Sequence, residues 1–232
     1  MRHFVLSGAL FAAIPCFSAE LLVACASDLA PAQTALAAAF ERATGQRVRF
    51  VSGSSGTLAR QIANGAPFDV FLSANRGYVE DLVREAAVRA GSVRIYGKGR
   101  LALWPQKSLE ELRGAGIRQI AIPNPKHAPY GVAARQALEK AGLWKELESK
   151  IVYGENVRQA LQYADSGNAD AVLTSWTLLQ GRGVLLNESL HQPIHQAGAI
   201  TTATKHPQLA ALFLRFLVEG EGVGVLAKFG LR

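Results

Sequence analysis

The chain has 232 residues, of which 49% are hydrophobic and 19% charged, so it can bury a core as one large domain or two smaller lobes. This composition excludes a disordered, collagen-like or coiled-coil chain. The net charge of +7 comes from scattered Lys and Arg residues without interleaved aromatic residues, so we expect no nucleic-acid partner.

The first residues predict an exported protein. A short basic lead over residues 1–3 precedes an apolar run over residues 4–15, and the small residues Ser18 and Ala19 follow. This pattern is typical of a secretory signal peptide, here over residues 1–19, although an uncleaved membrane anchor is the alternative. The apolar run is short for a membrane span. Cleavage would leave Cys25 as the only thiol, which we expect to be buried.

The rest of the chain alternates short apolar runs with amphipathic segments of helical period. The predicted elements are, in chain order, a strand over residues 21–26, a helix over 31–43, a strand over 47–52, a helix over 57–64, a strand over 68–73, a helix over 78–87, a long strand over 96–104, a strand over 119–122, a helix over 131–141, a strand over 151–153, a helix over 157–166, a strand over 169–173, a strand over 194–201 and a helix over 207–219. This alternation predicts an α/β fold, with a mostly parallel sheet covered by helices on both faces.

Four strand-to-helix junctions carry small polar residues where ligands bind in such sheets. They are residues 25–31, 52–57, 124–131 and 154–158. The first turn of a helix has unpaired N–H groups and a partial positive charge, so it can bind an anion without Lys or Arg. The hydroxyls of Ser27 and Ser55 would add donors. Each junction alone could be an ordinary helix cap, but together the four favour a tetrahedral oxyanion.

Enzyme motifs are absent from the sequence. The spacing around Ser54 and Ser55 does not match a nucleophile elbow, and the five histidines show no zinc-binding spacing. We expect His127 and His195 to be surface or loop residues. The protein is therefore predicted not to be an enzyme and to need no cofactor.

Two alternatives to an oxyanion receptor stay open. One is a receptor for another solute, such as sulfate, ferric ion or a small organic anion. Iron would need Tyr130, Asp28 and Glu155, the only suitable side chains at the junctions. The other alternative is a secreted hydrolase that uses Ser54 or Ser55 as its nucleophile and His127 as its base.

The flanks of the junctions resemble the molybdate-binding proteins of ABC transporters. The matching segments are ACASDL at residues 24–29, GSSGTLARQI at 53–62, NGAPFDVFLSA at 64–74, NP at 124–125, APYG at 128–131 and ENV at 155–157. This resemblance, from about residue 21 to the C-terminus, implies a type II periplasmic-binding-protein fold with two lobes joined by a two-strand hinge. It places residues 20–96 and 199–232 in lobe 1 and residues 97–198 in lobe 2.

The resemblance also implies the ligand contacts. Ser27 and Ser55 of lobe 1 would donate through their hydroxyls, and Tyr130 and Val157 of lobe 2 mainly through backbone N–H groups. The metal centre of molybdate or tungstate would be bound only through its oxygens. The partner would be an ABC permease, and we expect a periplasmic monomer.

Two positions depart from the family pattern. Some members have a ligand-contacting Tyr after the strand over residues 169–173, where this chain has Thr174. Another branch, which Tyr130 resembles, has Asn in place of Asp28. An ionised Asp28 facing an anion would repel it, so we expect Asp28 to cap the following helix with its carboxylate turned away. Asp28 and Thr174 are further candidates for the site.

Overall fold

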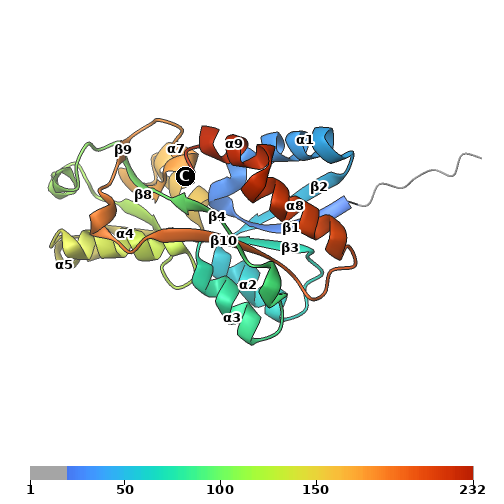
Figure 1. Ribbon diagram of the computed structural model, residues 1–232. Helices are drawn as coiled ribbons and strands as arrows, with labels where there is room; N and C mark the ends of the chain where they lie inside the picture. Colours follow the sequence, from blue (N-terminus) through green and yellow to red (C-terminus); the bar gives the residue numbers. More distant parts are fainter. Residues whose placement is uncertain (1–19, 232) are drawn as a thin grey trace, which may run out of the picture.

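The computed structural model describes residues 20–231, so the predicted signal peptide lies outside the described residues. The described chain forms two five-stranded sheets, each flanked by helices (Figure 1). The chain passes from one sheet to the other and returns, which produces two lobes. The predicted α/β class with two lobes is confirmed. The prediction of a mostly parallel sheet is wrong, because parallel and antiparallel strand pairs are equally frequent in the two sheets.

The first sheet has the order β2-β1-β3-β10-β4. Its strands are β1 (Glu20–Ala26), β2 (Arg47–Gly53), β3 (Val70–Ser73), β4 (Arg94–Gly99) and β10 (Ile194–Ile200). β1 runs parallel to β2 and β3, whereas β10 runs antiparallel to β3 and β4. One face is covered by α1 (Gln33–Thr44), α8 (Pro207–Glu219) and α9 (Glu221–Lys228), and the other by α2 (Ser55–Ala63) and α3 (Arg76–Arg84).

Side-chain alternation along β1 divides the core of the first lobe. Val23 and Cys25 pack into the cluster under α1 and α8, while Ala24 packs into the cluster under α2 and α3. In the first cluster, the ring of Phe40 meets that of Phe213 edge-on, with centroids 5.2 Å apart. Burying an aromatic side chain of this size stabilises the fold by about 1.5–3 kcal/mol. The prediction that Cys25 is buried is confirmed.

The second sheet has the order β7-β6-β8-β5-β9. Its strands are β5 (Leu101–Trp104), β6 (Ile120–Pro123), β7 (Ile151–Gly154), β8 (Ala171–Ser175) and β9 (Val184–Leu185). α4 (Pro129–Lys140) and α5 (Trp144–Leu147) pack on one face, and α6 (Val157–Asp165) and α7 (Trp176–Leu179) on the other. Short 3-10 helices complete the described chain: η1 (Ser27–Ala32), η2 (Ala90–Ser92), η3 (Glu110–Arg113), η4 (Glu148–Lys150) and η5 (Glu188–Leu190).

The crossing between the lobes lies at Arg100. The single long strand predicted over residues 96–104 is wrong, because β4 ends at Gly99 in the first sheet and β5 begins at Leu101 in the second. On the return, β10 joins the first sheet at Ile194, which pairs with Gly99. Both crossing strands run through the middle of Figure 1. The predicted lobe boundaries, at residues 96/97 and 198/199, fall inside β4 and β10.

Several short helices and strands were not predicted from the sequence. α5, α7 and β9 span four, four and two residues, too few for a periodicity to emerge. The helix predicted over 31–43 begins as the 3-10 helix η1 and becomes α-helical only at Gln33. In the part of the chain that the structure describes, every helix is too short or too polar to cross a membrane.

Candidate functional site

The four predicted junctions meet in one cavity between the lobes. Lobe 1 contributes the ends of β1 and β2 and the start of α2, and lobe 2 contributes the starts of α4 and α6. The cavity is small, and it is lined by Ala26, Ser27, Asp28, Gly53, Ser54, Ser55, Ala74, Ala128, Pro129, Tyr130, Asn156 and Val157. The structure therefore brings Ser27, Ser55, Tyr130 and Val157 together from both lobes. Each of them is at most 5% exposed.

Backbone donors at the cavity come from three helix starts. Ser55 and Val157 are the first residues of α2 and α6, and Tyr130 is the second residue of α4. The Asn156 side chain caps α6 by accepting from the N–H groups of Arg158 and Gln159, not from that of Val157. First-turn N–H groups have no partner within their own helix. Together with the helix dipoles, they make the cavity attractive to an anion.

The two serine hydroxyls differ in their present partners. Ser55 Oγ accepts from the backbone N–H of Ala74 at 3.0 Å, which leaves its own proton for a ligand. Ser27 Oγ donates to the backbone carbonyl of Gly53 at 2.9 Å. Ser27 can donate to a ligand only if its hydroxyl rotates away from that carbonyl. Ser55 is therefore the better prepared of the two donors.

Asp28 does not take the role that the sequence predicts. Asp28 lies in the first turn of η1, one residue beyond Ser27, and it lines the cavity, so the prediction of a carboxylate turned away from the site is wrong. Its Oδ2 accepts from the Tyr130 hydroxyl at 3.0 Å and from the Gln196 amide. Burial raises the pKa of Asp28 from 3.8 to about 6, although hydrogen bonds from the Gln196 and Tyr130 side chains, and contacts with the backbone N–H groups of Asp28 and Leu29, oppose this shift.

Gln196, which no sequence pattern singles out, supports the site from behind the cavity. It lies on β10, is fully buried, and donates to both the Asp28 carboxylate and the Tyr130 hydroxyl. Its only signal in the sequence is a polar residue within a predicted strand. Gly99 faces this network, since a Cβ there would collide with the Tyr130 hydroxyl and lie 2.9 Å from Gln196 Nε2.

Thr174, the other further candidate, lies behind the cavity and not among its lining residues. Its hydroxyl donates to the backbone carbonyl of Val157 at 3.1 Å. This contact ties the start of α6 to the end of β8. In this structure Thr174 therefore positions Val157.

A second set of contacts holds the lobes together beside the cavity. The backbone N–H of Gly56 donates to the carbonyl of His127 at 2.9 Å, and His127 Nδ1 lies 3.0 Å from Ser54 Oγ. The Thr57 hydroxyl donates to the Glu155 carboxylate at 3.2 Å. The prediction that His127 is a surface or loop residue is therefore wrong in one respect, because its side chain is buried at the contact between the lobes.

These contacts also bear on the hydrolase alternative. A catalytic serine must give its proton to the histidine base. The Ser54 hydroxyl instead donates to Thr57 Oγ1 at 2.8 Å, and Thr57 in turn donates to Glu155. The proton of Ser54 is thus directed away from His127. These hydrogen bonds hold the two lobes together.

For iron, two of the three predicted ligand side chains converge. Asp28 and Tyr130 line the cavity, whereas Glu155 lines the neighbouring groove. Within residues 20–231, no cluster of three or more His, Cys, Asp or Glu side chains is arranged to hold a metal ion.

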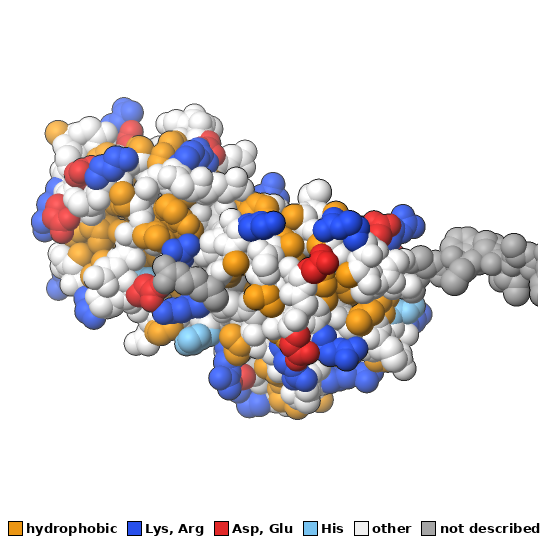
Figure 2. All heavy atoms as spheres, turned by 45° about the horizontal axis from the view of Figure 1, so that its top comes forward, with side chains coloured by type: hydrophobic (Ala, Val, Ile, Leu, Met, Phe, Trp, Pro, Cys, Tyr) orange, Lys and Arg blue, Asp and Glu red, His pale blue; other side chains and the backbone are white. Residues whose placement is uncertain are grey.

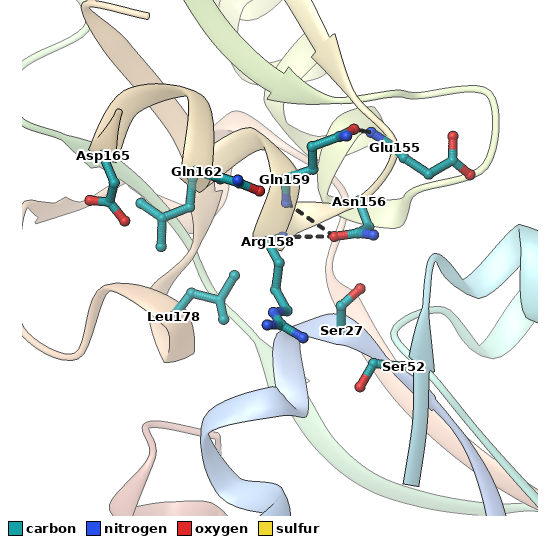
Figure 3. Close-up of a pocket in the computed structure, with 10 residues that line it drawn as sticks. Ser27, Ser52, Glu155, Asn156, Arg158, Gln159, Gln162, Asp165 and Leu178 are labelled. Carbon is teal, nitrogen blue, oxygen red and sulfur yellow. Dashed lines mark hydrogen bonds between the residues drawn. The ribbon is translucent and has the colours of Figure 1, made fainter. Parts of the chain in front are cut away.

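A wider groove opens beside the cavity and shares Ser27 and Asn156 with it (Figure 3). Its lining includes one cationic side chain, Arg158, together with the carboxylates of Glu155 and Asp165. In Figure 3 the guanidinium of Arg158 extends from α6 toward Ser27. On the face of the molecule in Figure 2, other Lys and Arg side chains are scattered among acidic and apolar ones. Arg158 therefore places a positive charge in the groove that borders the cavity.

Two α/β lobes closed over a small polar cavity define a solute-binding protein. The chain belongs to the bacterial extracellular solute-binding protein family, whose model matches residues 21–232. It is 34% identical to the molybdate-binding protein ModA of Azotobacter vinelandii, over 99% of this chain and 96% of that protein. It is 31% identical to the ModA of Rhodobacter capsulatus, over 94% and 90% of the two chains.

A solved structure supports the same assignment. The periplasmic molybdate-binding protein of Azotobacter vinelandii superimposes with a TM-score of 0.86 at 32% sequence identity, covering 91% of this chain and 98% of that chain. The predicted resemblance to the molybdate-binding proteins of ABC transporters is therefore confirmed, and with it the periplasmic-binding-protein fold.

Proposed function

We propose that this protein is an extracytoplasmic receptor that binds molybdate or tungstate between its lobes and delivers it to an ABC importer. The observation that carries the proposal is the convergence of three helix starts and two serine hydroxyls, from both lobes, on one buried cavity. Such a site supplies donors to several oxygens of a tetrahedral dianion. The names of the relatives favour molybdate within this class of ligand.

The proposed binding contacts follow from the geometry. Ser55 would donate from its hydroxyl, and Ser27 would do so after its hydroxyl leaves the Gly53 carbonyl. Tyr130 and Val157 would donate from the backbone of lobe 2. Because these donors lie on opposite lobes, the anion would join the lobes and stabilise the closed form. No bond is made or broken in this mechanism, which is that of a receptor and not of an enzyme.

Delivery places the protein outside the cytoplasm. The predicted signal peptide over residues 1–19 would export the chain to the periplasm, and the closed, loaded form would dock on the permease as a monomer. N-terminal sequencing of the secreted protein, with cleavage expected after Ser18 or Ala19, tests export.

Isothermal titration calorimetry of the mature protein with molybdate, tungstate, sulfate and phosphate tests the ligand. Molybdate and tungstate are close in size and should bind with similar affinity, while sulfate is smaller and should bind more weakly. Sulfate binding without any response to molybdate would refute the proposed ligand. A colour change with ferric ion would favour iron instead.

A further inference from the structure

Asp28 combines three properties in one side chain. It lines the cavity, it is 1% exposed, and its Oδ1 is buried and makes no hydrogen bond of ordinary length and angle. We propose that Asp28 binds the oxyanion as a neutral carboxylic acid that donates a hydrogen bond from Oδ1, so that ligand binding takes up one proton. This inference rests on the proposed function and deepens it by adding a donor, and a dependence on pH, to the same site.

The hydrogen bonds determine which oxygen carries the proton. Oδ2 already accepts from the Tyr130 hydroxyl and the Gln196 amide, so it has little capacity left to hold a proton as well. Oδ1 makes no such hydrogen bond. A proton on Oδ1 turns this unsatisfied acceptor into a donor, and an oxygen of the bound anion would be its acceptor.

The charge of the bound anion also favours the neutral, protonated form of Asp28. Asp28 takes part in none of the ion pairs among the described residues. A dianion in the cavity would place negative charge beside a buried carboxylate, and the low local dielectric makes that repulsion strong. Taking a proton from solvent removes the repulsion and the unsatisfied acceptor together. The alternative, an ionised Asp28, would favour an oxyanion that carries its own proton, such as hydrogen phosphate.

The groups packed around Asp28 do not supply the proton. The titratable ones are Cys25 on β1, Tyr96 on β4 and Tyr130 on α4, and burial raises the pKa of each. All three therefore stay protonated and uncharged near neutral pH. Arg100, between β4 and β5, acts on the Tyr130 hydroxyl and remains charged throughout. Asp28 is thus the buried group of this network that titrates.

The coupling between proton uptake and ligand binding determines how the affinity changes with pH. Without a second anion beside it the pKa of Asp28 is about 6, so Asp28 is ionised at neutral pH and must gain a proton on binding. The affinity for a fully deprotonated anion should then fall about tenfold for each pH unit above that pKa.

The test is calorimetry with sodium molybdate in two buffers that differ in ionisation enthalpy, at about pH 7.5, where the free carboxyl is ionised. We expect the wild-type protein to take up about one proton per molybdate. Asp28→Asn keeps the size of the side chain and offers an amide donor without titrating, so it should bind molybdate with no proton uptake and no pH dependence. His127→Gln is the control: it replaces an imidazole that contacts Ser54 beside the cavity, and this variant should retain the proton uptake. The wild-type measurement needs no variant to fold.

The outcomes separate this inference from the proposed function. Molybdate binding by the wild type without proton uptake would overturn the inference and leave the function standing. Binding of hydrogen phosphate in preference to molybdate would show that Asp28 acts as an acceptor, and it would overturn both. Wild type and Asp28→Asn that both fail to bind molybdate or tungstate at any pH would overturn the function itself.

Discussion

The buried carboxylate of Asp28 should lower the stability of the ligand-free protein at neutral pH. Its pKa is 3.8 in an exposed chain and about 6 in the folded protein, because burial disfavours the charged form. This difference corresponds to about 3 kcal/mol between the two protonation states. Asp28→Asn removes the charge and keeps the shape, so the variant should be more stable than the wild type by up to about 3 kcal/mol at neutral pH.

The sign of the pH dependence follows from the raised pKa. Between pH 3.8 and about 6 the folded wild type holds a proton on Asp28 that the unfolded chain has lost, so the contribution of Asp28 to stability is most favourable below 3.8 and is lost as the pH rises through about 6. The difference in stability between Asp28→Asn and the wild type should therefore grow from pH 3.8 to about pH 6 and stay constant at higher pH. Subtracting the two stability curves removes the contributions of the other carboxylates.

Urea unfolding followed by circular dichroism, at intervals from about pH 3.5 to about pH 8, measures this difference. Asp165→Asn is the matched control, because it removes an exposed carboxylate paired with Arg182 and should change stability by less than about 1 kcal/mol. A difference between wild type and Asp28→Asn that does not vary with pH would refute the reasoning. So would an Asp28→Asn variant that is less stable than the wild type at neutral pH.

Three further predictions concern the site. Ser27→Ala and Ser55→Ala should each weaken molybdate binding by about 1–3 kcal/mol in calorimetry. Ser52→Ala, which removes a hydroxyl of the outer groove that accepts from Gln33, should leave the affinity unchanged, and unchanged affinity in both cavity variants would place the site elsewhere. Arg158→Gln should lower the association rate several-fold in stopped-flow experiments at low salt, as expected of electrostatic steering, and an increase in the dissociation rate alone would contradict this role. Gly99→Ala should lower the free energy of unfolding by about 1–3 kcal/mol, because the added Cβ would collide with the side chains that bind Asp28. An unchanged melting temperature would show that the backbone near Gly99 shifts to accommodate the methyl group.

Much of the fold could be predicted because its signals are local. Apolar runs of period two and amphipathic runs of period 3.6 alternate along the chain, and Gly, Ser, Asn and Pro mark the junctions between them. Parallel strands bring their carboxyl ends together, so the four strand-to-helix junctions could be expected at one place. The resemblance to the molybdate-binding proteins then indicated Ser27, Ser55, Tyr130 and Val157 within those junctions.

The position of the hinge could not be predicted from the local sequence pattern. Residues 96–104 read as one extended apolar strand, since the backbone is extended on both sides of Arg100. Only the choice of partners separates β4 from β5: β4 pairs with β10, and β5 pairs with β8 and β9. Strand pairing joins residues far apart in sequence, so it depends on the whole fold.

The role of Asp28 shows the same division between sequence and structure. By itself, the sequence determined that a small acidic residue begins a helix beside an anion-binding junction, and the local rule for that position is a helix cap. The tertiary structure decided otherwise, because Tyr130 and Gln196 reach the carboxylate from 102 and 168 residues along the chain. Partners at such distances, and the burial they impose, determine the charge of a side chain, and no neighbouring residue in the sequence encodes them.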